Sequence, residues 1–344
     1  MQNTYKVAIL SGEREVEIVE KELKQPTGNQ VLVKVSYCAI CTLEQRIYSG
    51  IMKRYPFAGG HEAAGTVAAV GEKVKSVKVG DKVSVRMLTS CGECYYCRSG
   101  HENQCVISFK ADIHEGVGGP GGFAEYMMLD AKTIYKMEDS IDLRYAALTE
   151  PLACCVHSVN NAGIEFGNDV VVIGGGIMGD FHIQLAKRKG ARVIVCEVDQ
   201  ERLETAKAVG ADILINSKET NAIEKVKEIT QGRGADVVFC TAALPQLADD
   251  AIHMTGKIGR VVMYSSFPAN KPVELDVNRV HSTEINITGA VNQNASDFLA
   301  AARLLSFGII DPSHYISEVV PLEKIDYAFT RAIDPETFRV LVEL

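Results

Sequence analysis

The sequence lacks the features that mark membrane and nucleic-acid-binding proteins. No stretch approaches the roughly 18 consecutive apolar residues of a membrane span. Basic side chains are in the minority, with 36 Lys and Arg against 44 Asp and Glu, and the formal net charge is −8. Nucleic acid and anionic membranes both require basic patches. The first ten residues alternate like a strand and contain no signal-peptide core, so we expect a cytoplasmic protein that binds neither partner.

Internal repeats and low-complexity linkers are also missing. The 344 residues are 47% hydrophobic and 23% charged, which is ordinary globular composition, and the length favours two domains. The first 150 residues contain short strand-like runs separated by glycines, which predicts an irregular β-rich domain. The clearest runs are 31–35, 65–70 and 82–85.

From about residue 155 onward, apolar strands alternate with helices. Such a pattern indicates a parallel sheet that helices cover on both faces. The strands are expected at 169–173, 192–196, 212–215, 236–240, 260–264 and 285–289, with helices at 177–189 and 201–209. A helix at 295–307 and a strand at 338–344 are expected in the tail. Periodicity does not show which domain the tail joins.

Ten cysteines are present, and four of them are clustered. In a long chain from a reducing compartment, clustered cysteines favour metal binding over disulfides. Four thiolates at short spacings can close a tetrahedral zinc shell without an open position, which predicts a structural site. Free thiols and an iron–sulfur cluster are the alternatives. The four residues are Cys91, Cys94, Cys97 and Cys105. Plain core positions are expected for Cys154, Cys155, Cys196 and Cys240.

A second set of potential ligands is dispersed along the first domain. It consists of Cys41, His61, Glu62 and Glu150. One thiolate, one imidazole and one or two carboxylates would leave a zinc position open, where the pKa of a bound water or alcohol falls. Each residue alone also has an ordinary structural interpretation, and composition and spacing do not establish this site.

A glycine-rich segment lies between an expected strand and an expected helix. Residues 174–179 read Gly-Gly-Gly-Ile-Met-Gly and fit G-x-G-x-x-G. Glycines there permit a tight turn and close approach to a pyrophosphate, which the helix N-terminus binds. A ligand-free turn is the alternative. The expected contacts are Gly174, Gly176, Ile177, Met178 and Gly179.

Glu197 ends the next expected strand, about twenty residues after the glycine-rich turn. A carboxylate at this place accepts hydrogen bonds from ribose hydroxyls and repels a 2′-phosphate, so NAD is favoured over NADP. If NADP were used, Arg202 is the candidate for binding its phosphate. Otherwise Arg202 is a solvated helix charge.

Together these motifs resemble the zinc-containing medium-chain dehydrogenases, with sorbitol (polyol) and threonine dehydrogenases nearest in character. The run 60–65, Gly-His-Glu-Ala-Ala-Gly, is similar to the family's zinc signature, and the 91–105 lobe is similar to its structural-zinc loop. Further similar segments are 80–83, 121–126 and 150–153.

This resemblance implies a GroES-like catalytic domain over 1–155 and 291–344, and a Rossmann NAD-binding domain over 156–290. It implies Cys41, His61, Glu62 and Glu150 around a catalytic zinc, with Cys41 and His61 as the more regular ligands in the family. It also implies two zinc ions per chain and a homo-oligomer, either a dimer or a tetramer.

The chain departs from the family pattern immediately after Cys41. Thr42-Leu43-Glu44 stands where Gly-Thr/Ser-Asp is usual, so the hydroxyl that shuttles the alcohol proton falls at Leu43. A histidine that is frequent in the family falls at Arg46. Thr42, Glu62, Glu150 or a zinc-bound water would have to replace this relay, and the sequence does not choose among them.

We therefore expect an oxidoreductase that transfers a hydride between a secondary alcohol and NAD. A polyol, sugar or sugar-derived alcohol is the leading substrate class. An amino-alcohol or simple alcohol dehydrogenase is the alternative enzyme, and a non-catalytic NAD-binding protein is the alternative from another class.

Overall fold

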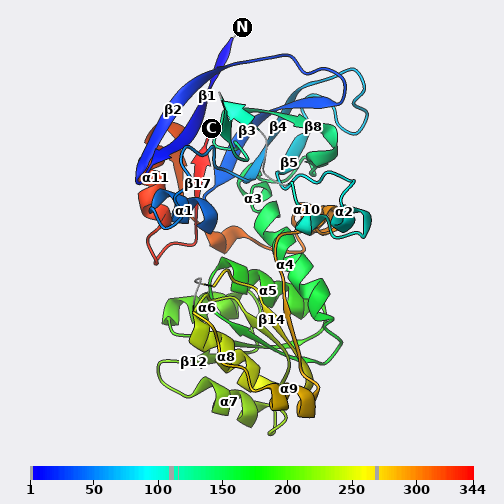
Figure 1. The fold of residues 1–344 in the computed structure, drawn as a ribbon, viewed down its shortest axis with the longest axis vertical. Coiled ribbons are helices and arrows are strands. Elements are labelled where there is room, and N and C mark those ends of the chain that lie inside the picture. Colours follow the sequence, from blue (N-terminus) through cyan, green and yellow to red (C-terminus); the bar gives the residue numbers. More distant parts are fainter. Residues whose placement is uncertain (1–2, 108–111, 115, 268–270) are drawn as a thin grey trace. The chain divides into compact units, whose positions relative to one another are not determined.

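The computed structural model describes residues 3–107, 112–114, 116–267 and 271–344, which form two compact units (Figure 1). One unit contains Met1–Ala153 and Asn292–Leu344, and the other contains Cys154–Val291. The tail, whose partner the periodicity leaves open, therefore belongs to the first unit. Among the described residues, no helix is long and apolar enough to cross a membrane.

The first unit is built on a seven-stranded sheet with the order β16-β17-β3-β4-β5-β9, and β8 pairs with β3 beside this path. Its strands are β3 (Gln30–Ala39), β4 (Glu62–Val70), β5 (Lys82–Arg86), β8 (Tyr126–Asp130), β9 (Ile134–Lys136), β16 (Ile316–Pro321) and β17 (Arg339–Glu343). Two small antiparallel sheets join β1 (Thr4–Gly12) to β2 (Glu15–Glu22) and β6 (Asp112–His114) to β7 (Val117–Gly118).

Short helices connect these strands. They are α1 (Thr42–Tyr48), α2 (Tyr95–Arg98), α3 (Leu143–Ala146), α10 (Ala295–Ser306) and α11 (Ile325–Ala332), with single 3-10 turns at Glu102–Gln104, Ala131–Thr133, Ser313–Tyr315 and Leu322–Lys324. The helix α4 (Thr149–Ala162) carries the chain from the first unit into the second.

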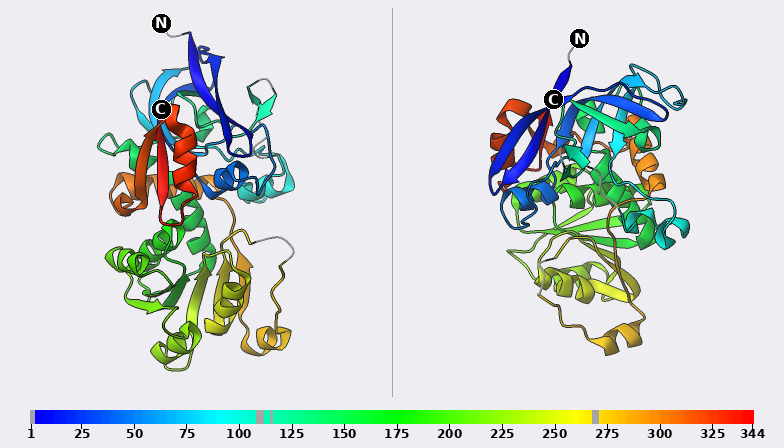
Figure 2. Two further views of the ribbon diagram at one scale, coloured as in Figure 1. Left: turned by 90° about the vertical axis from the view of Figure 1, so that its left-hand side faces the viewer. Right: turned by 45° about the horizontal axis from the view of Figure 1, so that its top comes forward.

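The C-terminal strand β17 lies within the first sheet, between β16 and β3. β17 pairs antiparallel with β3, with Leu341 opposite Ala39, and β3 in turn pairs antiparallel with β4. In the left view of Figure 2 the red C-terminal strand lies beside the orange strand β16, with which it pairs in parallel. Because neighbours on both sides of β3 run against it, the end of β3 meets the beginnings of β4 and β17.

The second unit is a six-stranded parallel sheet with the order β12-β11-β10-β13-β14-β15. Its strands are β10 (Asp169–Ile173), β11 (Arg192–Glu197), β12 (Ile213–Asn216), β13 (Ala235–Cys240), β14 (Thr255–Met263) and β15 (Asn286–Gly289). Its helices are α5 (Ile177–Arg188), α6 (Gln200–Ala208), α7 (Ala222–Ile229), α8 (Pro245–Met254) and α9 (Val277–Thr283). All five residues of β10 are buried, as both-face coverage requires.

The strand order reverses direction between β10 and β13. Right-handed crossovers then place the helices that follow β10 and β11 on one face, and those that precede and follow β13 on the other. In agreement, α5 contacts α6, and α7 contacts α8. This is the doubly wound Rossmann arrangement, so the predicted fold class is confirmed for both units.

Sequence periodicity placed most elements of the second unit within a few residues of their observed bounds. One expectation about the core was wrong. Cys155, Cys196 and Cys240 are buried, but Cys154 is only partly buried. Cys154 occupies a different face of α4 from its neighbour Cys155, because successive helical residues point about 100° apart.

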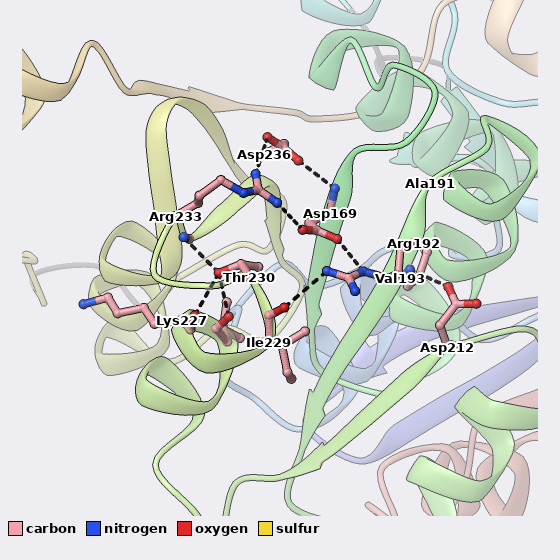
Figure 3. A network of polar contacts seen from close by, with 12 residues as sticks. Asp169, Ala191, Arg192, Val193, Asp212, Lys227, Ile229, Thr230, Arg233 and Asp236 are labelled. Atoms are coloured by element: carbon pink, nitrogen blue, oxygen red, sulfur yellow. Dashed lines mark hydrogen bonds and ion pairs between the residues drawn. The ribbon is translucent and has the colours of Figure 1, made fainter.

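A polar network joins the beginnings of three parallel strands in the second unit (Figure 3). The glycine-rich turn follows the opposite end of β10. Asp169 is its centre: one carboxylate oxygen lies 2.6 Å from Arg192 Nε and the other 2.9 Å from Arg233 Nη2. The backbone N–H of Asp169 donates to Asp236 Oδ2 at 2.7 Å. The network therefore ties β10, β11 and the turn before β13 together.

We predict that Asp169→Asn lowers the free energy of unfolding by about 1–2 kcal/mol, because it replaces a charged acceptor of two guanidinium groups. Both arginine side chains are more than a third exposed, which limits the loss through solvent screening. Urea unfolding measures the effect. The matched control is Glu228→Gln, which breaks the exposed pair with Lys225. Equal effects of the two substitutions would contradict the importance of this network.

Candidate functional site

The first cluster forms where β3, β4 and β17 meet. Cys41 follows β3 and precedes α1, His61 and Glu62 stand at the start of β4, and Arg339 is the first residue of β17. Register places Ala39 opposite both Glu62 and Leu341. The antiparallel pairing thus collects side chains that are far apart in the sequence at one end of the sheet.

Glu44 fixes the orientation of the His61 ring. Glu44 lies in the first turn of α1, is fully buried, and its Oε1 is 2.8 Å from Nδ1 of His61. The same oxygen accepts the backbone N–H of Gly60 at 2.9 Å. With Nδ1 engaged, Nε2 is the ring nitrogen left for a metal, which is the arrangement of a carboxylate–histidine–metal relay.

Opposing effects act on the pKa values of this pair. Burial alone would raise the pKa of Glu44, but His61 and the Gly60 amide reverse this and lower it. Burial likewise would lower the pKa of His61, whereas the charges of Glu44 and Cys41 raise it well above its ordinary range. A bound cation would add its own charge to this balance.

Gly60 is a position that no other residue fits easily. Its φ is +91°, and a Cβ there would approach the backbone nitrogen of Phe123 to 2.6 Å. This turn leads directly into His61 and Glu62 at the start of β4, and the N–H of Gly60 donates to Glu44. The glycine of the Gly-His-Glu run is therefore explained by backbone geometry.

Glu62 is held by an ion pair with Arg339. The guanidinium approaches both carboxylate oxygens, at 2.7 and 3.0 Å, and both side chains are almost completely buried. Nη2 of Arg339 also lies 3.8 Å from Cys41 Sγ. Glu62 therefore faces an internal cation that competes with a metal for its oxygens.

Glu150 reaches the cluster from the first turn of α4. Its carboxylate and the ligand atoms of His61 and Glu62 lie within 4.8 Å of one another, as do those of Cys41, Glu44 and His61. The structure thus brings together all four residues expected around the second metal, and it adds Glu44 and Arg339. A set of one thiol, one imidazole nitrogen and one carboxylate suits zinc.

Leu43 does not replace the missing relay hydroxyl. It is partly buried and packs against the hydrophobic core of the first unit, while Thr42 is exposed. Leu43 therefore contributes to the packing of the first unit's core.

The four-cysteine lobe forms a second, separate cluster. The sulfur atoms of Cys91, Cys94, Cys97 and Cys105 all lie within 4.8 Å of one another. Cys91 and Cys97 are 3.8 Å apart, close to the sulfur–sulfur distance of about 3.8 Å that a tetrahedral shell with 2.3 Å zinc–sulfur bonds requires. Backbone N–H groups of Glu93 and Cys94 donate to Cys91 Sγ at 3.4 and 3.3 Å. Such amide donors stabilise thiolate, so the lobe fits a zinc ion.

The thiols of the lobe differ in their pKa values. The backbone N–H of Cys97 lowers the pKa of Cys94 to about 6, whereas desolvation raises that of Cys97 to about 12. Without a cation, thiolates this close disfavour one another's ionisation. A divalent ion removes that conflict because it deprotonates coordinating thiols outright.

The glycine-rich turn connects β10 to α5 as expected. Gly176 is the N-cap of α5, and its neighbours Ile177 and Met178 begin the helix. A Cβ on Gly179 would lie 1.9 Å from the carbonyl oxygen of Gly174, so this glycine permits the helix to pack directly on the turn. The free N–H groups of the first helical turn provide an anion site.

Glu197 and Arg202 flank this turn. Glu197 Oε2 accepts the N–H of Gly175 at 2.7 Å, and its Oε1 accepts those of Val198 and Asp199 at 2.6 and 3.0 Å. Arg202 lies so near the turn that a Cβ on Gly176 would be 3.4 Å from its Nη1. Both side chains thus lie beside the turn at which a ribose and its phosphates are expected.

Sequence reasoning missed Glu44 and Arg339. The sequence does contain a signal for Glu44: a carboxylate in the first helical turn after a ligand-type cysteine needs a polar partner if it is buried. Arg339 left none, because 277 positions separate it from Glu62 and only strand pairing brings the two together.

We predict that Cys97→Ser removes about one zinc ion per chain and lowers the melting temperature by about 5 °C or more, because metal-binding energy is folding energy for the segment that holds it. Dinucleotide binding should persist, since the lobe and the glycine-rich turn lie in different units. Zinc analysis and thermal unfolding measure both effects. The control Glu93→Gln changes the same loop without removing a thiol, and it should retain wild-type values. Unchanged zinc content and melting temperature in Cys97→Ser would rule out a metal role for the lobe.

Comparison with known proteins agrees with this geometry. Residues 27–139 match the alcohol dehydrogenase GroES-like domain model, and residues 178–306 match the zinc-binding dehydrogenase model. The chain is 33% identical over 337 residues to 2-dehydro-3-deoxy-L-galactonate 5-dehydrogenase of Pseudoalteromonas atlantica, covering 96% of each chain. It is 31% identical to sorbitol dehydrogenase of Bacillus subtilis, covering 98% of this chain and 96% of the relative.

Solved structures with the same fold include nucleotide complexes. A protein from Sinorhizobium meliloti 1021 bound to NADP is 27% identical with a TM-score of 0.92, and 100% of each chain is covered. An alcohol dehydrogenase from Escherichia coli CFT073 in complex with NADH is 29% identical with a TM-score of 0.90, again over 100% of each chain. The predicted resemblance is confirmed: this chain belongs to the zinc-containing medium-chain dehydrogenase family.

Proposed function

We propose that the protein oxidises a secondary alcohol of the polyol, sugar or sugar-derived class to a ketone with NAD, or catalyses the reverse reaction. The observation that carries the proposal is that Cys41 and Glu150 each lie within 4.8 Å of His61, in two groups that share this histidine, beside a charge-paired Glu62. The named activities of the relatives supply the substrate class, since both act on a sugar acid or a sugar alcohol.

Cys41 Sγ, His61 Nε2 and Glu150 are the groups that would hold the catalytic zinc. At that position zinc supplies Lewis-acid polarisation of the substrate oxygen. Glu44 maintains the His61 ring in its orientation. Arg339 holds both carboxylate oxygens of Glu62 in place, so that in our proposal Glu62 shapes the site without being a permanent ligand.

Glu150 is also the best candidate to accept the alcohol proton. It is partly exposed, whereas Glu62 is fully buried and bound by Arg339 on both oxygens. Leu43 packs against the core and has no proton to exchange. General-base assistance of this kind is worth about 10²–10⁴-fold in rate, so a proton acceptor is needed.

Cys91, Cys94, Cys97 and Cys105 would hold the second zinc ion, giving two per chain. NAD supplies the hydride acceptor at C4 of its nicotinamide. Its pyrophosphate would bind at Gly176–Met178, and its ribose hydroxyls would donate to Glu197. Medium-chain relatives imply a dimer or tetramer, which we expect here as well.

The proposal predicts NAD reduction in a panel of alcohols. Polyols and sugar-derived secondary alcohols should react with the highest kcat/KM, ahead of threonine and simple secondary alcohols. His61→Ala should bind NAD normally but lose at least about a hundredfold in kcat, because the substrate oxygen loses its electrophile. Highest activity with threonine would favour the amino-alcohol alternative. NAD binding without turnover of any alcohol would favour a non-catalytic protein.

Replacing Glu197 tests the cofactor preference. The wild type should use NAD in preference to NADP, and Glu197→Gln should raise relative NADP use about tenfold or more, because it removes a charge that repels the 2′-phosphate. Glutamine retains one acceptor oxygen, for the N–H of Gly175, and loses the second acceptor, which binds the N–H groups of Val198 and Asp199. Glu197→Ala is the comparison, because it removes both the charge and the acceptor and should also weaken NAD. Equal use of both cofactors by the wild type would show that Glu197 does not read the ribose, and Arg202 would then be the phosphate ligand to test.

A further inference from the structure

A buried carboxylate directly below the glycine-rich turn has no assigned role. Asp180 follows Gly179 in the first turn of α5, and its side chain is completely buried. Among the described residues, neither of its carboxylate oxygens has a hydrogen-bond partner. An ionised carboxylate in such surroundings is strongly destabilised, so this side chain requires an explanation.

The surroundings of Asp180 are those of the dinucleotide site. From α6 it faces Arg202, whose guanidinium lies beside Gly176, and from the end of β11 it faces Glu197, which binds the N–H of Gly175. His182, on its own helix, is turned to Ser158 and the Met178 carbonyl, and burial lowers its pKa to about 4, so it carries no charge. The charge of Asp180 is therefore added to a local balance of Glu197 and Arg202.

The net charge of Asp180, Glu197 and Arg202 together depends on one proton. With Asp180 neutral, the opposite charges of Glu197 and Arg202 cancel. With Asp180 ionised, the three groups carry one net negative charge beneath the turn that must accept an anionic pyrophosphate. Charges that are separated by desolvated protein interact strongly, and the favourable N-terminus of α5 is weakened by a carboxylate that occupies its first turn.

We propose that Asp180 is a determinant of cofactor affinity that acts as a neutral acid: the glycine-rich turn binds the dinucleotide tightly only while Asp180 holds a proton, and binding retains or takes up that proton from solvent. This inference rests on the proposed use of NAD. Both carboxylate oxygens remain available, so the protonated form can also donate its O–H to a group or water brought by the ligand.

The pH dependence follows from the direction of the pKa shift. Desolvation, and to a smaller extent Glu197, raises the pKa of Asp180 to about 8, although Arg202 opposes this. The affinity for the dinucleotide is therefore highest below about pH 7 and falls as the pH rises through 8. If the pyrophosphate raises the Asp180 pKa by one further unit, the two forms differ about tenfold in affinity.

The test is isothermal titration of the full-length zinc-loaded protein with NAD between pH 6.5 and pH 9.5. We expect the Kd of the wild type to rise about tenfold across this range. Near pH 8, titrations in buffers of different ionisation enthalpy should show proton uptake on binding. Asp180→Asn, which is neutral at every pH and similar in shape, should have a nearly pH-independent Kd and should take up no proton at this site.

Two further variants complete the design. Glu204→Gln removes a carboxylate from the exposed face of α6 and should behave as the wild type. Asp180→Leu is neutral and removes the unpaired polar atoms, so it provides a folded alternative if the asparagine variant is unstable. A wild-type pH profile in folded Asp180→Asn or Asp180→Leu would overturn the inference while leaving NAD binding intact. Absence of NAD binding by the wild type at every pH would overturn the proposed function as well.

Discussion

The buried ion pair between Glu62 and Arg339 is the interaction on which the first unit depends. It joins the first residue of β4 to the first residue of β17, across the end of β3. Removing one member of such a pair leaves an uncompensated buried charge, which typically costs about 3–5 kcal/mol. Cys41 lies beside Arg339, and His61 directly precedes Glu62 in the chain. The ion pair that joins β4 to β17 therefore also sets the positions of the potential metal ligands.

In the second unit, the groups that stabilise the fold and the groups available for binding lie toward opposite ends of the strands. At the beginnings of β10, β11 and β13, Asp169 and two arginines form a closed network. Beyond the other ends of these strands, Glu197 accepts backbone N–H groups and has spare lone pairs, and the Asp180 carboxylate has no hydrogen-bond partner among the described residues. This distribution is expected for a doubly wound sheet, because ligands bind at the carboxyl ends of parallel strands near the reversal of strand order.

The departures from the family pattern have two different physical meanings. Leu43 stands where a hydroxyl is usual and contributes to core packing. Glu44 stands where an aspartate is usual and retains the acidic function, since it bonds to His61. The longer side chain has room because Gly59 carries no side chain: a Cβ there would lie 2.9 Å from Glu44 Cγ.

Local pattern was sufficient for whatever depends on neighbours in the chain. Apolar runs predicted the buried parallel strands, G-x-G-x-x-G predicted the turn into α5, and four closely spaced cysteines predicted the lobe whose sulfur atoms gather within 4.8 Å. These features are local because backbone geometry and short loops set them. Tertiary structure decided the rest: that the tail returns as β17 beside β3, that Arg339 pairs with Glu62, and that Asp180 is buried with no hydrogen-bond partner in the part of the chain that the structure describes. Strand pairing and desolvation join residues at any separation along the chain, so no window of sequence contains them.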